Sequence, residues 1–451
     1  MRPTERRARR SPARRTWPRA AGAVIAVLLV LVTGASAGRP YVQPLLTGGI
    51  TAAGGGVRVL PAGPRGPVPP RPPDAAQAHW LAAGAVPGTT AAQQAVATRA
   101  LLDLKLLVRP DGAVAAAWYP GWKYAWPRDS SWVAAALAAT GHGAEALGVL
   151  RFIARVQPRS GVWAARYQLS GDGPVRDGRP AELDADGWFP WAVWFWYTEG
   201  GSAGRPVLAR TELAKTELTR TELTRTELTS LWPAVRRAAD TTVSRLGRDG
   251  LPPASMDYWE DRVSSVTIGI AAPLLAGLRA AADLARILGD TGDARNWSAA
   301  AGRLGRAITA GFGATGYQRT PSAAGGADAA ATFLGPPFAA APAAVRRAVA
   351  ATVRKITLAN GGVEPGSVWA GDPGEAWTPE TGFFALYDAA SGDRAGAAHW
   401  LGWLAAHRTA FGSLPEQVNA DGRPASVAPL AWTDAIALLA MTAERHRLPM
   451  P

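Results

Sequence analysis

Apolar residues recur at helical spacing along most of the chain, and this periodicity is the feature that most restricts its fold. No alternating apolar-polar run of comparable length is present, so strands are not expected to form the core. The pattern predicts eleven helices and a short partner near 75–81; the eleven cover residues 91–107, 129–140, 144–156, 187–198, 229–246, 267–288, 293–311, 343–357, 379–390, 394–407 and 430–446. Residues 80–451 are therefore expected to form a single all-α domain.

The composition excludes several kinds of site. The 451 residues contain no Cys, so disulfides, thiolate-bound metals and cysteine nucleophiles are excluded together. The five His residues are scattered and form no HExxH motif, so we expect neither a metal nor a cofactor. A chain with 48% hydrophobic and 18% charged residues is long and apolar enough to bury a large core.

Much of the positive charge lies in an N-terminal segment with the features of an export signal. The first twenty residues carry eight Arg and one Glu, which is +7 of the net charge of +13. An apolar run over 20–32 follows, and then Ala35-Ser36-Ala37, so residues 1–37 are predicted to be a secretory signal. Because the run is shorter than the ~20 residues of a membrane span, cleavage is favoured over a retained anchor in residues 20–37.

Two further expectations follow from the N-terminal region. The protein is expected outside the cell or at its surface, and residues 38–79, rich in Gly and Pro, are expected to be a semi-rigid linker. The remaining charges are interspersed rather than clustered, so no nucleic-acid partner is expected.

A five-residue repeat, RTELA-KTELT-RTELT-RTELT, occupies residues 210–229. A step of five residues advances 140° around a helix, so the four Leu residues do not share one face. We interpret the repeat as an insertion that extends the exposed start of the next helix. A binding or coiled-coil role is the alternative.

The 19 Trp residues are an excess with two explanations. Indole faces stack on the C–H faces of sugar rings, whereas most buried Trp residues simply fill a core. Trp194, Trp400 and Trp403 lie within predicted helices and are expected in the core. Trp122 and Trp126 lie in a turn among charged residues and are better candidates for a binding surface.

Two carboxylate-bearing segments offer the chemistry of a hydrolase. Glu260 follows Trp259 within 255–262, where further carboxylates crowd it, and such surroundings suit a general acid. Glu416 stands in a short loop ahead of the last predicted helix. A glycosidase needs one protonated and one ionised carboxyl group on either side of the scissile bond. The sequence alone does not show whether Glu260 and Glu416 lie close together in the folded protein.

Four motifs occur in a characteristic order along the chain: Trp126-Pro-Arg-Asp, Asp257-Tyr-Trp-Glu-Asp, Leu414-Pro-Glu-Gln and Pro429-Leu-Ala-Trp. In this set the chain resembles glycoside hydrolase family 15, which contains glucoamylases, glucodextranases and some bacterial trehalases. The resemblance extends from about residue 101 to residue 446. It differs at 362–367, which read Gly-Val-Glu-Pro-Gly-Ser where the family often has an Arg-Tyr pair.

The resemblance implies an (α/α)6 barrel of inner and outer helices that acts on α-linked glucose-containing oligo- or polysaccharides. It implies that Glu260 is the general acid and Glu416 the general base of an inverting, exo-acting α-glucosidase. Arg128 and Asp129 would hold the hydroxyls of the terminal sugar. The full set of substrate-binding residues that it implies is Trp122, Tyr124, Trp126, Arg128, Asp129, Asp257, Trp259, Asp261, Trp377 and Trp432.

Some alternatives stay open at the level of sequence. Asp129 has the position of an ordinary helix N-cap, with Arg128 as its ion partner. A non-catalytic, cell-surface carbohydrate-binding protein on the same fold is the main alternative function, and a phosphorylase on a related barrel is a third. The glucosidic linkage and the oligomeric state do not follow from the sequence.

Overall fold

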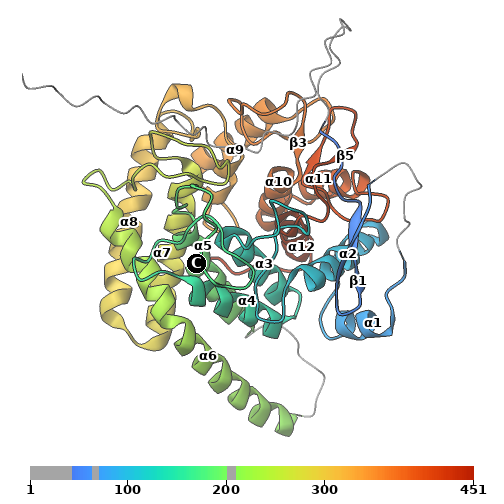
Figure 1. Cartoon of the computed structure of the whole chain (residues 1–451). Coiled ribbons are helices and arrows are strands. Elements are labelled where there is room, and N and C mark those ends of the chain that lie inside the picture. Colours follow the sequence, from blue (N-terminus) through green and yellow to red (C-terminus); the bar gives the residue numbers. More distant parts are fainter. Residues whose placement is uncertain (1–42, 63–70, 201–209) are drawn as a thin grey trace, which may run out of the picture. The chain divides into compact units, whose positions relative to one another are not determined.

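A computed structural model of the chain describes residues 43–62, 71–200 and 210–451 (Figure 1). The predicted signal at 1–37 lies outside these residues. The described part contains twelve α-helices, and all of the predicted ones are confirmed. They are α1 (Ala75–Ala82), α2 (Ala91–Leu107), α3 (Pro127–Ala139), α4 (Gly143–Val156), α5 (Ala185–Gly200), α6 (Arg210–Arg245), α7 (Ile268–Leu288), α8 (Thr291–Gly313), α9 (Ala343–Ile356), α10 (Thr378–Ser391), α11 (Arg394–Ala406) and α12 (Ala431–Ala443).

The helices form two concentric rings (Figure 1). The inner ring runs α3, α5, α7, the 3-10 helix η2 (Ala329–Leu334), α10 and α12, each packed on the next, and α12 returns to α3 and closes the ring. Helices α2, α4, α6, α8, α9 and α11 pack against it from outside. This is the expected (α/α)6 arrangement, with one short 3-10 helix in an inner position.

The distribution of apolar residues explains which helices are inside. Every residue of α3 is buried, as expected for a helix that is surrounded by others. On the outer helix α9 the buried residues instead follow a single stripe: Val345, Ala348, Val349, Thr352 and Ile356. Helix α7 is apolar and long enough to cross a membrane by composition, but it packs within the protein as an inner helix.

Two glycines allow the inner helices α5 and α7 to pack closely. A Cβ atom on Gly187 of α5 would lie 2.2 Å from the carbonyl oxygen of Pro273 in α7. A Cβ on Gly277 would lie 2.5 Å from the Cα of Gly187. Neither position tolerates a side chain unless the two backbones separate, so this part of the ring depends on glycine.

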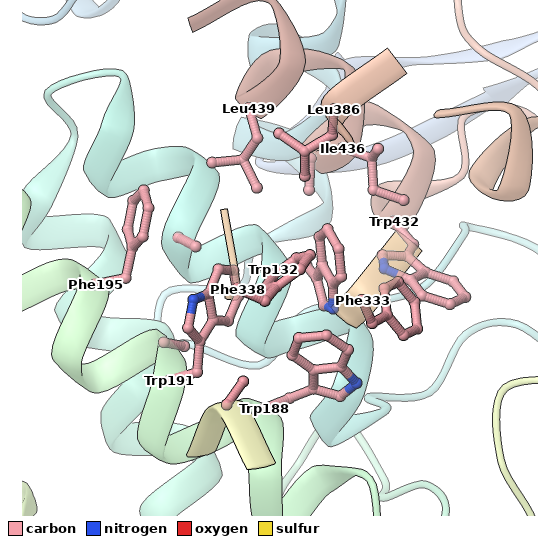
Figure 2. Close-up of a cluster of buried hydrophobic side chains, with 14 of the residues drawn as sticks. Trp132, Trp188, Trp191, Phe195, Phe333, Phe338, Leu386, Trp432, Ile436 and Leu439 are labelled. Atoms are coloured by element: carbon pink, nitrogen blue, oxygen red, sulfur yellow. The ribbon is translucent and has the colours of Figure 1, made fainter. Parts of the chain in front are cut away.

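An aromatic cluster fills the centre of the ring (Figure 2). The ring of Trp188 lies 5.0 Å from that of Trp132 and 5.0 Å from that of Phe333, with interplanar angles near those of edge-to-face pairs. Phe338 and Trp432 complete contacts to the same group. These side chains come from α3, α5, η2, the turn after η2 and α12, so the cluster joins elements from distant parts of the sequence.

The linker predicted over 38–79 is wrong for part of its length. Strands β1 (Gly49–Ala53) and β2 (Gly56–Leu60) pair as an antiparallel hairpin, and Ile50 is buried in the main core. Gly54 and Gly55 occupy its turn with φ values of +55° and +78°, a conformation that favours glycine. The Gly-rich sequence that suggested a tether is therefore a hairpin turn.

The five-residue repeat forms the first half of α6, as predicted. Leu228, near the end of the repeat, and Leu231 are buried against the ring. The repeat thus lengthens an outer helix and contributes no element to the inner ring.

The aromatic cluster predicts a large stability effect at Trp188. Trp188→Ala removes a fully buried indole that touches four other rings, and such truncations cost about 3–5 kcal/mol. Denaturant unfolding followed by circular dichroism measures this change. Val368→Ala, at a residue that is 50% exposed, is the control and is expected to cost less than about 0.5 kcal/mol.

Candidate active site

The N-terminal ends of the inner elements meet at one end of the ring. Hydroxyls of Thr378 in α10 and Thr433 in α12 lie 2.7 Å apart, and the Arg128 guanidinium of α3 lies 4.9 Å from the Trp432 ring centroid. Helices α3, α7, α10 and α12 begin without a side-chain cap. Their free N–H groups and dipoles make this end electropositive, which explains why carboxylates gather there.

The two candidate catalytic carboxylates lie on either side of one short segment. The indole N–H of Trp122 donates to Glu416 Oε1 at 2.9 Å. Four residues later, the indole N–H of Trp126 donates to Glu260 Oε1, also at 2.9 Å. The structure thus brings together two residues 156 positions apart in sequence, and both Trp residues reach the carboxylates themselves.

Glu416 is held by neutral hydrogen-bond donors. Besides Trp122, the hydroxyl of Ser426 donates to its Oε2, and its backbone N–H bonds the carbonyl of Val427 at 2.8 Å. Burial raises the pKa of Glu416, while the bonds from Ser426 and Trp122 act in the opposite direction. A carboxylate with a raised pKa and fixed orientation suits proton abstraction from water.

Glu260 is surrounded by cations. Its Oε1 lies 3.7 Å from Nη2 of the buried Arg128, and its Oε2 pairs with Arg179, a residue that the sequence did not suggest. Its backbone has a φ of +56°, a left-handed conformation that costs a non-glycine residue about 1 kcal/mol. The turn is closed by its own N–H, which bonds the Asp257 carbonyl at 2.7 Å. Strain of this kind is common at functional sites.

Three buried carboxyl groups share the guanidinium of Arg128. Glu182 lies 2.6 Å from Nη1, Asp184 3.4 Å from Nη1 and Asp129 3.2 Å from Nε. Burial raises the pKa of Asp129 to about 6, and it also raises the pKa values of Glu182 and Asp184, which repel each other. The side chain of Asp129 accepts from Arg128 and makes no N-cap bond, so the ordinary cap interpretation is wrong.

Asp257 has a different role from the one predicted. It is fully buried beneath Glu260, where it accepts from Arg319 at 2.8 Å and from the Thr267 hydroxyl at 2.7 Å. Arg319 also bonds Asp328 at 2.8 Å. With no exposed surface, Asp257 does not reach a substrate; it fixes the loop that carries Glu260. This correction follows from burial, which the sequence motif does not encode.

The remaining predicted aromatic residues form two separate sets of ring contacts. Trp259 packs under the Arg319 guanidinium at 3.6 Å, and Trp369, absent from the predictions, bridges it to Trp377. In the second set, Tyr124 lies edge-on to Trp126.

Two further predicted residues lie at opposite extremes of burial. Trp432 is buried against the aromatic cluster, with the Arg128 guanidinium over its ring. Asp261 is exposed beside Glu260.

An N-terminal strap, residues 44–47, supports the loop behind Glu416. Ser426 donates its N–H to Pro44 O at 3.0 Å and accepts from Leu46 N at 2.6 Å. The buried Thr47 hydroxyl donates to Ala428 O and accepts from Ala428 N, both at 2.8 Å. Ser426 has a φ of +60°, and these bonds hold it in that conformation, with its hydroxyl on Glu416.

Glu380 adds a buried carboxyl group at the same end of the ring. It lies in the first turn of α10, and its Oε2 has no hydrogen-bond partner. Burial, together with the charges of Glu416 and Asp328, raises its pKa to about 8. Glu380 is therefore protonated at neutral pH in the folded protein.

Sequence reasoning missed several of these residues for different reasons. Glu182 and Asp184 had a visible signal, because they form an acidic run just before a predicted helix. Arg179, Arg319 and Ser426 had none, since each acquires its role only through a contact with a distant segment.

Comparisons with known proteins agree on the architecture. No protein-family model matches the sequence, and no curated protein is similar to it. A glycosidase solved in complex with glucose matches with a TM-score of 0.62 at 20% identity, over 83% of this chain and 99% of that one. A bacterial glucoamylase complexed with acarbose matches with a TM-score of 0.59 at 19% identity, over 79% and 56%. The glucoamylase from Saccharomycopsis fibuligera gives 0.57 at 14% identity, over 74% and 89%.

The chain therefore has the glucoamylase-type (α/α)6 fold, which is the fold that the motifs implied. At these identities the likeness establishes the arrangement of helices, while the activity has to be argued from the site.

The raised pKa of Glu380 predicts a pH-dependent contribution to stability. In the unfolded chain the pKa is ~4.3, so stability is fully present below that pH and is lost as the pH rises through about 8. Glu380→Gln, which cannot ionise, is expected to melt like the wild type near pH ~4 and several degrees higher near pH ~8.5. Thermal unfolding across this range measures the difference. Glu227→Gln on α6 is the control, and identical melting of Glu380→Gln and wild type near pH ~8.5 would contradict the assignment.

The strap predicts that Thr47 orders the loop behind Glu416. Thr47→Val keeps the shape but leaves the buried N–H and carbonyl of Ala428 unsatisfied, at a cost of about 1–3 kcal/mol. Amide hydrogen exchange at Glu416 and Ser426 is expected to accelerate, because their N–H bonds depend on this loop. Thr47→Ser keeps the hydroxyl and should restore slow exchange. Unchanged hydrogen exchange in Thr47→Val would show that Thr47 contacts the loop without ordering it.

Proposed function

We propose that this protein is a glycoside hydrolase of glucoamylase type: an inverting, exo-acting enzyme that removes terminal glucosyl residues from α-glucans or small α-glucosides. The observation that carries the proposal is the pair of indole N–H groups, from Trp122 and Trp126, that bind Glu416 and Glu260. Glycoside hydrolysis requires two carboxyl groups on either side of the scissile bond, and these two lie on either side of one short segment. The fold shared with glucoamylases supports the same conclusion.

In the proposed reaction Glu260 protonates the glycosidic oxygen and Glu416 takes a proton from the attacking water. For inversion the two carboxyl groups stand ~6.5–9.5 Å apart, so that a water fits between the base and the anomeric carbon. Arg128 and Asp129 would bind hydroxyls of the terminal sugar, and Trp377 offers a half-buried indole face for stacking. The reaction proposed here uses no metal and no cofactor.

One observation favours the alternative, a carbohydrate-binding protein without catalysis. Arg128 and Arg179 both contact Glu260, and two guanidiniums stabilise a carboxylate rather than the carboxylic acid that donates a proton. Sugar binding without release of product would support this alternative. Hydrolysis would rule this alternative out.

We also propose that the protein is exported. The basic first twenty residues, the apolar run after them and Ala35-Ser36-Ala37 support a signal at the N-terminus. Fractionation of expressing cells, with mass determination of the recovered chain, distinguishes a cleaved signal from a retained anchor.

Catalysis is tested by changing each carboxylate separately. Glu260→Gln and Glu416→Gln keep the size of the side chain but remove acid and base, so each is expected to lower kcat by about 10²–10⁴. The assay offers maltose, isomaltose, trehalose and a longer dextrin, and NMR identifies the anomer first released. We expect β-glucose from an α-linked substrate.

Glu227→Gln on the outer helix α6 is the matched control and should keep wild-type turnover. Wild-type turnover in either active-site variant, with the fold intact, would contradict the proposal. Release of α-glucose would show that the enzyme retains the anomeric configuration instead of inverting it.

A further inference from the structure

Arg179 occupies the side of Glu260 that a leaving group has to reach. The two oxygens of Glu260 have different partners: Oε1 accepts from Trp126 and lies near the buried Arg128, whereas Oε2 pairs with Arg179. The side chains of Arg179 and Glu260 are 34% and 27% exposed, in contrast to 5% for Arg128. Oε2, the outer oxygen of the candidate acid, therefore lies on its more open side, where Arg179 pairs with it.

The segment that carries Arg179 is fastened to the rest of the site. Asp177 accepts from Arg166 and lies 3.3 Å from Nε of Arg179. Arg166 in turn donates to the carbonyl of Gly121 at 2.8 Å and lies 5.0 Å from the Trp126 ring centroid. Arg179 is thus held next to the segment that bears both catalytic-site Trp residues, and it is not a free surface side chain.

Neighbouring cations repel the charge of Arg179, so additional oxygen acceptors would stabilise its guanidinium. Burial, and the like charges of Arg166 and Arg128, lower its pKa, while Asp177 and Glu182 act in the opposite direction. A guanidinium in such surroundings gains from each hydroxyl or ring oxygen that approaches it. Adjacent hydroxyls of a sugar offer several acceptor oxygens to its five N–H donors.

The chemistry of the proposed reaction then assigns a role to this residue. A general acid lies next to the glycosidic oxygen, so the sugar that leaves must sit against the outer oxygen of Glu260. That sugar has to separate Arg179 from Glu260, which also removes a charge that favours the ionised acid. We propose that Arg179, once displaced, binds hydroxyls of the leaving-group sugar and determines which aglycones are accepted. This inference rests on the proposed hydrolase function.

The test compares a sugar leaving group with one that has no hydroxyls. The substrates are the disaccharide that wild type cleaves fastest, among maltose, isomaltose and trehalose, and 4-nitrophenyl α-glucoside. Arg179→Gln is expected to lower kcat/KM at least about tenfold for the disaccharide and less than about threefold for the nitrophenyl glucoside. Arg179→Lys, which keeps the charge without the fork, should recover part of the loss. Arg176→Gln, an exposed arginine on the same segment, is the control and should leave both values unchanged.

Each other outcome overturns the proposal in a recognisable way. Equal losses on both substrates would show that Arg179 acts through Glu260 and not on the leaving group. Equal gains would show that it blocks the site in the free enzyme. Unchanged values would show that it has no part in the reaction. If wild type hydrolyses none of these substrates, nor the longer dextrin, the proposed function itself fails, and this inference fails with it.

Discussion

The closure of the inner ring is the constraint on which the rest of the structure depends. A helix such as α3, buried along its whole length, has no free face on which to display chemistry, so only its ends can carry a site. Because each inner element follows an outer helix, all inner N-termini meet at the same end, and their dipoles add there. The excess of buried carboxyl groups at that end is a consequence of this geometry.

The two candidate catalytic groups have different electrostatic surroundings at this end of the ring. Neutral donors from Ser426 and Trp122 hold Glu416, whereas guanidiniums from Arg128 and Arg179 surround Glu260. Catalytic acids and bases are recognised by environments that push their protonation apart. In the structure two guanidiniums face Glu260, so the proposed role as acid requires that the ligand alter these surroundings.

Helical periodicity made most of the fold predictable, and short motifs suggested the two candidate catalytic carboxylates. The helices could be placed because their apolar stripes are long, and Glu260 and Glu416 became candidates because they lie in ordered motifs. The hairpin at 49–60 was missed because its strands are short and its Gly-rich turn resembles linker sequence. The burial of Asp257 and the contact of Arg179 depend on pairings across long separations, which no local pattern records.

The contacts that hold Glu416 differ from those that hold Glu260, and the difference matches their proposed roles as base and acid. Glu416 is fixed through Ser426 by the buried strap at 44–47, and a base that orients one water benefits from such rigidity. Glu260 is fixed from below by the buried Asp257 network, but its outer oxygen faces an ion pair that is partly open to solvent. Exposed ion pairs are weak, about 0–1 kcal/mol, so this contact can break each time a leaving group enters or departs. In the proposed reaction, a rigid base and an acid with an exchangeable ion partner would allow turnover without movement of the helical ring.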